Sequence, residues 1–196
     1  MQPLVLHDTV AEPLFWANVG AWGAVEAFMY LRARMRLPDR GIDPSQALLL
    51  GSMVVGIALG RYAADRADGL GLPGGGWWPV IVGLVVLWAG VAYRVWAVRT
   101  LGRFFQYTVV VQPGQTVVEA GPYSRIRHPS YAGLVLGMLG LGIALDNALA
   151  VVACVLPPLA AFTVRLLSEE RVLARELGEP YRAYMRRTHR LIPGVW

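Results

Sequence analysis

Five apolar segments separated by short polar loops constrain the fold of this chain more than any other feature. They cover residues 14–31, 47–62, 77–98, 131–145 and 148–167. A helix needs about 20 apolar residues to cross a bilayer, with about 17 as the lower end. Two of the segments, 77–98 and 148–167, meet this length comfortably, 14–31 is adequate, and the other two are short. The pattern predicts an all-α integral membrane protein with about five transmembrane helices.

The composition supports this interpretation and leaves room for one domain. The 196 residues are 56% hydrophobic and 16% charged, whereas soluble domains are about 45–50% apolar and about 25% charged. We therefore treat residues 1–196 as a single membrane domain. Residues 14–98 form an N-terminal three-helix part, and residues 99–196 hold the polar motifs described below.

The positive charges predict how the helices are oriented. All 18 basic residues are arginine, and they gather in alternate loops and in the tail. The first loop contains four of them: Arg32, Arg34, Arg36 and Arg40. Basic loops face the cytoplasm, so we expect the N-terminus outside and the C-terminus cytoplasmic. The +5 net charge is then a topological signal, and no nucleic-acid partner is expected. Arginine without lysine indicates a GC-rich genome and favours a bacterial plasma membrane.

The last two apolar segments are joined by Asp146 and Asn147, which predicts an antiparallel helical hairpin. Pro157 and Pro158 should kink the second of these helices, because neither proline donates a backbone N–H. Four glycines lie in the first helix of this hairpin, residues 131–145: Gly133, Gly137, Gly140 and Gly142. They would allow either close helix packing or a lateral opening, and the sequence does not decide between the two. Cys154 is the single cysteine, so no disulfide within the chain and no metal site are expected.

Residues 100–130 form a cytoplasmic segment that is too long for a simple turn. Its centre, residues 107–118, contains two runs rich in β-formers around a turn at Pro113 and Gly114. We expect a small cytoplasmic β-hairpin that packs against the tail, since two strands alone are marginal in water. A surface hairpin without a role is the alternative.

Residues 168–196 predict a C-terminal cytoplasmic helical tail. Leu173 and Leu177 recur at helical spacing, and Gly178 is a typical helix stop. In the following segment, Tyr181 and Tyr184 share one helix face. One interpretation is an interfacial helix with aromatic anchors at the lipid headgroups.

Arg165 and Glu169 lie four residues apart at the cytoplasmic end of the fifth apolar segment. The spacing places both side chains on one helix face. They form either a simple ion pair or a site for a zwitterionic ligand, in which glutamate takes an ammonium and arginine a carboxylate. The spacing does not separate these alternatives.

The polar run 121–131 lies at the mouth of a membrane helix and contains Arg127-His128-Pro129-Ser130-Tyr131. The predicted hairpin, Glu169-Glu170 and the segment 178–184 follow in order. This ordered set resembles the isoprenylcysteine carboxyl methyltransferase family over roughly residues 101–193. The resemblance implies an integral membrane enzyme that uses S-adenosylmethionine, with residues 99–196 as its methyltransferase-like catalytic part.

The resemblance also implies the site residues. Arg165 matches an arginine placed against the methyl acceptor, and Arg127 is expected to be catalytic with it. Glu169 matches the acid that holds the cofactor's amino group. The remaining cofactor-binding residues are expected to be Gln112, Gln115, Thr116, Val117, Val118, Tyr123, His128, Pro129, Ser130 and Tyr131. The family has histidine where Gln115 stands, and glutamine cannot become cationic.

The implied reaction is methyl transfer to the carboxylate of a lipophilic or prenylcysteine-like acceptor at the cytoplasmic membrane face. A carboxylate acceptor needs no base at neutral pH, so its alignment with the methyl group is the main requirement. Arg165 suits a carboxylate acceptor better than an amine acceptor, which would need a base. Three alternatives stay open: a phospholipid or small-molecule methyltransferase on the same scaffold, a sterol-type NADPH reductase, and a non-catalytic membrane protein. The sequence predicts neither the acceptor nor the oligomeric state.

Overall fold

The computed structural model describes residues 3–35, 44–67 and 69–194, and these residues form helices joined by loops. The helices are α1 (Leu4–His7), α2 (Ala11–Arg34), α3 (Pro44–Arg66), α4 (Trp78–Leu101), α5 (Pro129–Ala144), α6 (Ala148–Glu176) and α7 (Glu179–Arg187), with short 3-10 turns η1 (Gly102–Phe104) and η2 (Gly121–Ser124). Arg36 and Arg40, two arginines of the first loop, lie outside the described residues.

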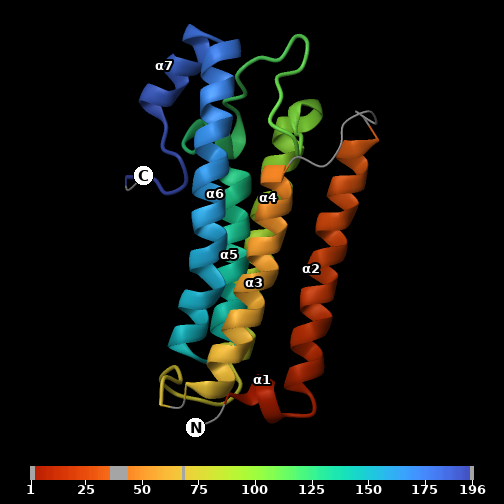
Figure 1. Cartoon of the computed structure of the whole chain (residues 1–196), viewed down its shortest axis with the longest axis vertical. Helices are drawn as coiled ribbons and strands as arrows, with labels where there is room; N and C mark the ends of the chain where they lie inside the picture. Colours follow the sequence, from red (N-terminus) through yellow and green to blue (C-terminus); the bar gives the residue numbers. More distant parts are fainter. Residues whose placement is uncertain (1–2, 36–43, 68, 195–196) are drawn as a thin grey trace.

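The helices α2 to α6 correspond to the five apolar segments and run side by side, with α2 at the edge of the bundle (Figure 1). The prediction of an all-α membrane fold is confirmed. Among the described residues, three helices are long and apolar enough to cross a membrane: Pro44–Arg66, Trp78–Phe104 and Ala148–Glu176. The apolar α5 is shorter, with 16 residues, and α2 carries Glu12, Asn18 and Glu26. The count of five spans therefore stays a prediction.

Glycines bring α4 and α5 into backbone contact. A Cβ atom at Gly90 of α4 would lie 2.6 Å from the Gly133 carbonyl oxygen, and one at Gly140 of α5 would lie 2.5 Å from the Gly83 carbonyl oxygen. Any larger side chain would push the helices apart, as in other membrane helix pairs that pack through small residues. Of the two possibilities for the glycines of α5, close packing holds at Gly133 and Gly140.

The two-residue linker between α5 and α6 forms the predicted antiparallel hairpin and is hydrogen-bonded to the loop between α3 and α4. The Asn147 side chain accepts hydrogen bonds from Leu149 N and Ala150 N, which caps the first turn of α6. Its amide also donates to the Ala67 carbonyl over 3.0 Å, and Asp146 Oδ1 accepts from Leu72 N over 3.2 Å. From this cap α6 continues through Pro157 and Pro158 as one helix.

The predicted cytoplasmic β-hairpin is absent from residues 105–120, which the structure describes in full. The turn itself forms: Gln115 N donates to the Gln112 carbonyl over 3.0 Å, and Gly114 takes a φ of 71°. The flanking runs do not pair as strands. Four of their valines line a pocket instead: Val109, Val110, Val117 and Val118. These valines are half-buried, and their packing overrides the local β-propensity.

The tail folds back onto the segment that precedes α5. After Gly178, which takes a φ of 65°, α7 begins, and the chain then runs beside residues 125–128. Arg127 N donates to the His189 carbonyl over 2.7 Å, and His128 N donates to the Arg190 carbonyl over 3.0 Å. Helix α7 and the segment 105–125 therefore lie together at one end of the bundle, opposite α1 (Figure 1).

Candidate active site

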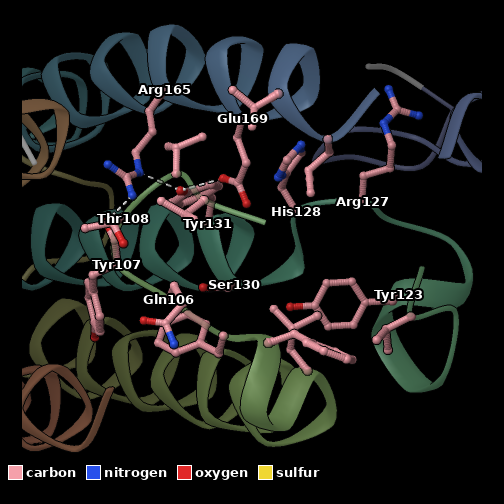
Figure 2. A pocket seen from close by; sticks show the side chains of 18 of the residues that line it. Gln106, Tyr107, Thr108, Tyr123, Arg127, His128, Ser130, Tyr131, Arg165 and Glu169 are labelled. Atoms are coloured by element: carbon pink, nitrogen blue, oxygen red, sulfur yellow. Dashed lines mark hydrogen bonds between the residues drawn. The ribbon is translucent and has the colours of Figure 1, made fainter. Parts of the chain in front are cut away.

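A pocket opens at the end of the bundle that α7 and residues 104–118 cover. The space inside it, including the part that is open to solvent, is about 1220 Å³. Its walls combine apolar side chains of α3 and of the 104–118 segment with polar groups from α2, α4, α5 and α6. Figure 2 shows Arg165, Glu169 and Tyr131 on one side of the pocket and Gln106 and Tyr123 on the facing side. A largely apolar cavity with a few convergent polar groups is the usual form of a ligand site.

The hydroxyl of Tyr131 lies between Arg165 and Glu169 (Figure 2). It accepts a hydrogen bond from Arg165 Nε over 2.8 Å and donates to Glu169 Oε2 over 3.0 Å. Its ring stacks on Phe162, with ring centroids 5.5 Å apart. Arg165 and Glu169 form no direct ion pair among the described residues, so the simple pair considered from their spacing is replaced by a three-residue chain through Tyr131.

Arg165 is held from three directions. Besides its bond to Tyr131, the guanidinium donates to Ser45 Oγ of α3 and to the backbone carbonyl of Tyr107. The residue is only 4% exposed. Three of its five N–H groups therefore donate to protein atoms, and the planar fork has a defined orientation in the pocket.

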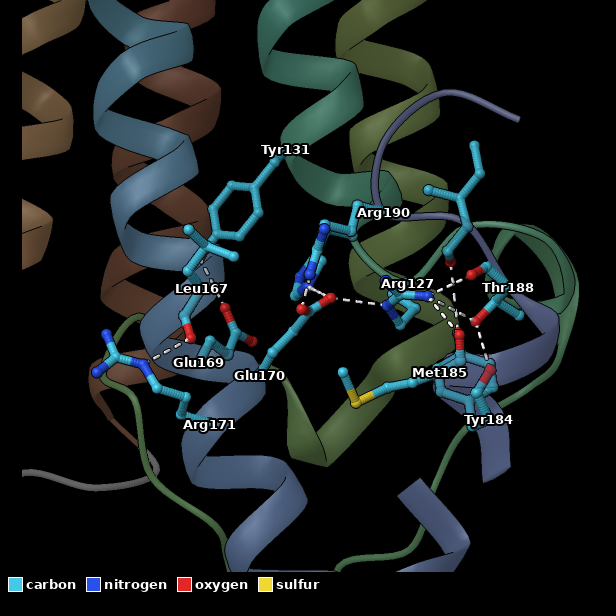
Figure 3. Close-up of polar contacts among 12 residues, drawn as sticks. Arg127, Tyr131, Leu167, Glu169, Glu170, Arg171, Tyr184, Met185, Thr188 and Arg190 are labelled. Atoms are coloured by element: carbon cyan, nitrogen blue, oxygen red, sulfur yellow. Dashed lines mark hydrogen bonds and ion pairs between the residues drawn. The ribbon is translucent and has the colours of Figure 1, made fainter. Parts of the chain in front are cut away.

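A second polar cluster surrounds Glu170 on the tail side of α6 (Figure 3). Glu170 Oε1 accepts from Arg127 Nε over 2.7 Å and lies 3.3 Å from His128 Nε2, and Glu170 Oε2 accepts from Arg190 Nε over 3.0 Å. Glu170 is 3% exposed. A buried carboxylate is tolerated when several donors surround it, and this one ties three segments together.

Arg127 directs its guanidinium at the tail. Besides Glu170, it donates to the Met185 carbonyl over 3.0 Å and to the Thr188 carbonyl (Figure 3). These two carbonyls belong to the end of α7 and the residue after it, where backbone acceptors lack helical partners. The guanidinium thus caps α7 while it neutralises Glu170.

A third polar cluster lies between α2, α4 and α5, and the motif analysis missed it. Arg94 of α4 forms a two-bond ion pair with Glu26 of α2, at 2.6 and 2.7 Å. Arg94 also donates to Ser130 Oγ over 2.5 Å and to the Tyr107 hydroxyl over 3.3 Å. The available signal was a charged residue inside each of two apolar segments, since such residues are rarely without a role.

The pocket gathers most of the predicted site residues. Those that line it are Gln115, Thr116, Val117, Val118, Tyr123, Arg127, His128, Ser130, Tyr131, Arg165 and Glu169. Gln112 and Pro129 are not part of the lining. The Gln112 side chain donates to the Arg103 carbonyl over 2.8 Å, and its backbone N–H donates to Gln115 Oε1 over 2.9 Å. Pro129 is fully buried in the first turn of α5, where proline is favoured.

Two tyrosines of α7 also line the pocket, which the sequence interpretation of this helix did not include. Tyr181 and Tyr184 are 4% and 2% exposed, so they are not anchors in a lipid headgroup layer. Tyr184 donates to the Tyr123 carbonyl over 2.6 Å. Burial, and then the nearby Glu169, raises the pKa of Tyr181, and burial raises the pKa of Tyr107 to about 12. Both hydroxyls are therefore hydrogen-bond donors at neutral pH.

Gln106 supplies a polar atom that has no protein partner among the described residues. Its Nε2 is buried, and the residue lines the pocket. A buried donor without a partner is costly, so a ligand oxygen in the pocket is a plausible acceptor for it. The described residues contain no group of three or more histidine, cysteine or acidic side chains that could hold a metal ion.

Comparison with known proteins confirms the resemblance drawn from the motifs. Residues 81–175 match the model of the isoprenylcysteine carboxyl methyltransferase (ICMT) family. The chain is 31% identical over 121 residues to the probable protein-S-isoprenylcysteine O-methyltransferase of Oryza sativa subsp. indica, covering 61% of this chain and 63% of that relative. It is 31% identical over 120 residues to the protein-S-isoprenylcysteine O-methyltransferase of Xenopus laevis, covering 60% and 42%. The matched part is thus less than two thirds of either relative.

One solved structure shares the fold over nearly the whole chain. It is described as the eukaryotic intramembrane Ras methyltransferase ICMT, and it superimposes with a TM-score of 0.63, covering 98% of this chain and 72% of that one. The sequence identity is 23%, so this likeness establishes the fold. The ICMT-like membrane architecture extends to the helices before residue 81.

Proposed function

Since residues 81–175 carry the isoprenylcysteine carboxyl methyltransferase pattern, we propose that this chain is a membrane methyltransferase. In this proposal it transfers the methyl group of S-adenosylmethionine to the carboxylate of a lipophilic, prenylcysteine-like acceptor. The observation that carries the proposal is the chain Arg165–Tyr131–Glu169 in one pocket, with 2.8 and 3.0 Å hydrogen bonds. The Arg165 cation and the Glu169 anion lie on opposite sides of the Tyr131 hydroxyl. This arrangement suits an acceptor with a carboxylate and a cofactor with an ammonium group.

The residues present suit S-adenosylmethionine. Glu169 Oε2 is engaged by Tyr131, and the remaining carboxylate oxygen is the natural partner for the ligand's ammonium group. Apolar walls from Val117 and Val118 and the ring of Tyr123 suit a nucleoside. His128 and Gln106 also line the pocket, and their polar groups could form hydrogen bonds with the ligand.

Arg165 suits the carboxylate of the acceptor. Its three bonds to Ser45, Tyr107 and Tyr131 hold the guanidinium plane still, and two further N–H groups of the fork can bind one carboxylate. When bound, S-adenosylmethionine supplies an electrophilic methyl group, whose S–C bond breaks as the carboxylate oxygen forms the new C–O bond. The protein's task is to hold the carboxylate in line and keep water away, effects worth up to roughly 7–11 kcal/mol for ideal geometry.

For Arg127 we propose positioning in place of the expected catalytic contact. The hydrogen bonds of its side chain go to Glu170, the α7 end and Thr188, which keeps Tyr181 and Tyr184 over the pocket. Gln112 and Pro129 fit the same role, because they shape the loop and the start of α5 without lining the pocket.

We further propose that the pocket faces the cytoplasm, in a bacterial plasma membrane with five spans. The end of the bundle with the pocket carries the basic residues of the 99–127 segment and the tail, whereas the opposite end of α3 has Arg61 and Arg66 with Asp65 beside them. Basic loops remain on the cytoplasmic side. A lipophilic acceptor can then arrive within the bilayer, while the water-soluble cofactor enters from the cytoplasm.

Binding and transfer assays on the purified protein in lipid nanodiscs test the proposal. S-adenosylmethionine and S-adenosylhomocysteine should bind by calorimetry, and NADPH should not. Methyl groups from a labelled donor should appear on an N-acetyl-S-prenylcysteine in preference to phospholipids or short-chain acids. Binding of NADPH alone would favour a reductase, and binding of neither cofactor would leave a membrane protein without this activity.

A further inference from the structure

Helix α2 reaches the pocket through one side chain, Glu26. This helix stands at the edge of the bundle (Figure 1), and Glu26 lies well before residues 81–175, which carry the family match. An acidic residue inside a membrane segment is expensive, and it is retained when it has a partner and a role. The partner is Arg94, and the role follows from what Arg94 contacts.

Arg94 is fully occupied by groups of the site. Two of its nitrogens bind the two oxygens of Glu26, at 2.6 and 2.7 Å, and its side chain is 4% exposed. Nη1 donates to Ser130 Oγ over 2.5 Å, and Nη2 donates to the Tyr107 hydroxyl over 3.3 Å. The ion pair therefore joins α2 to α5 and to the loop after α4.

The contacts of Arg94 with Tyr107 and Ser130 bear on Arg165, because both segments also supply hydrogen-bond acceptors to Arg165. Tyr107 provides the backbone carbonyl that accepts from Arg165. Ser130 directly precedes Tyr131, whose hydroxyl accepts from Arg165 Nε over 2.8 Å. The Tyr107 ring also packs edge-on against Tyr30 of α2, with ring centroids 5.3 Å apart. The buried guanidinium of Arg94 thus contacts the segments that supply two of the three groups orienting Arg165.

We propose that Glu26 and Arg94 are positioning residues of the proposed methyl transfer. They fix Tyr107 and the Ser130–Tyr131 step, and through these they hold the Arg165 fork in line for the acceptor carboxylate. The inference rests on the proposed function and adds α2 to the reaction machinery. Neither residue contacts the reacting groups, so their effect should fall more on acceptor turnover than on the cofactor contacts of Glu169.

The test compares Glu26→Gln with the matched control Glu12→Gln in the full chain in nanodiscs. Glu12 lies on the same helix and forms a half-exposed pair with Arg61, at 3.6 Å, far from the pocket residues. We expect Glu26→Gln to lower kcat/KM for an N-acetyl-S-prenylcysteine about ten- to a hundredfold, as small misplacements of reacting groups do. The unfolding temperature should fall relative to Glu12→Gln, because the substitution leaves the buried Arg94 without its counter-charge. The dissociation constant of S-adenosylhomocysteine should change far less than kcat/KM does.

Amide hydrogen exchange supplies a readout that needs no turnover. Without the Glu26 carboxylate, residues 105–110 should exchange faster than in the wild-type protein and in Glu12→Gln. Equal exchange and equal kcat/KM in the two variants would overturn the proposal. A loss of cofactor affinity as large as the loss of turnover would reduce Glu26 to a structural tie for α2 and overturn it too.

Arg94→Lys serves as a second variant in case Glu26→Gln does not fold. Lysine keeps the buried charge beside Glu26, but one ammonium cannot reproduce the planar fork that reaches Ser130 and Tyr107. It should lower kcat/KM with little change in S-adenosylhomocysteine binding, and unchanged kcat/KM would contradict the proposal. If the wild-type protein methylates none of the acceptors, the proposed function fails, and hydrogen exchange alone decides whether Glu26 orders residues 105–110.

Discussion

The Tyr131 hydroxyl and the Glu169 carboxylate lie 3.0 Å apart, one on α5 and the other on α6. The same hydroxyl accepts a hydrogen bond from Arg165. Through this hydroxyl, Glu169, the proposed partner of the cofactor, is linked to Arg165, the proposed partner of the acceptor. Changes at this hydroxyl should affect both ligands, whereas changes at either end should affect mainly one.

Tyr131→Phe removes the shared hydroxyl and keeps the ring that stacks on Phe162. A hydrogen bond to a charged group contributes about 1.5–3 kcal/mol, so we expect S-adenosylhomocysteine affinity and acceptor turnover each to fall by about tenfold or more. Calorimetry and a labelled-methyl assay measure the two. Tyr30→Phe is the control, since among the described residues the Tyr30 hydroxyl is hydrogen-bonded only to exposed Arg34. Unchanged affinity and turnover would show that the Tyr131 hydroxyl is not needed.

Glu169→Gln should weaken cofactor binding and leave folding intact. The neutral amide cannot attract the ligand's ammonium group, and the loss of a charge-assisted hydrogen bond should cost about 1.5–3 kcal/mol of binding free energy. Titration with S-adenosylmethionine measures it, with exposed Glu176→Gln of the same helix as the control. Undiminished affinity would remove Glu169 from the site.

Arg165→Ala should reduce acceptor turnover more than cofactor binding, because its fork is assigned to the acceptor carboxylate. We expect kcat/KM for the acceptor to fall by about a hundredfold or more, the effect of losing both alignment and charge stabilisation. Steady-state kinetics and S-adenosylhomocysteine titration separate the two effects. A larger loss in cofactor affinity than in turnover would assign Arg165 to the cofactor.

Glu170→Gln should loosen the tail. It leaves the buried Arg127 guanidinium without its counter-charge, and breaking a buried ion pair from one side costs about 3–5 kcal/mol. We expect a lower unfolding temperature and faster trypsin cleavage after Arg187 and Arg190. The exposed pair Glu179–Arg186 offers the control Glu179→Gln, which should change neither. Equal cleavage of the two variants would contradict the role assigned to Glu170.

The topology is testable by cysteine labelling, since the native Cys154 is buried. Leu70→Cys, at an exposed position of the loop between α3 and α4, should react with a membrane-impermeant maleimide added to intact cells. Arg186→Cys on α7 should react only after permeabilisation. The reverse pattern would place the pocket outside the cytoplasm and overturn the orientation proposed from the arginines.

The parts of the site that could be predicted from the sequence are those close together in the chain. The 127–131 motif and the pair Arg165 and Glu169 reach the pocket because each sits on one helix or its first turn, where spacing determines direction. Glu26 and Arg94 were missed because they are 68 residues apart. Whether two charges in separate apolar helices meet depends on how those helices rotate and pack.

The hairpin failed for a related reason. Residues 107–118 have the β-formers and the Pro-Gly turn that favour paired strands, and the turn at Gly114 does form. Strand pairing competes with burial, however, and valines of both runs line the pocket. Local propensity is small compared with such tertiary contacts.

By itself, the sequence determined the membrane class, the places of the five long helices and the family resemblance, because hydropathy and short motifs are local properties of the chain. Tertiary structure alone decided that Tyr131 stands between Arg165 and Glu169, that Arg127 secures the tail, and that Glu26 of α2 supports the pocket. These relationships depend on glycine contacts that set the distance between α4 and α5 and on a tail that folds back over their end. Such packing arises only when distant segments bury one another's surfaces.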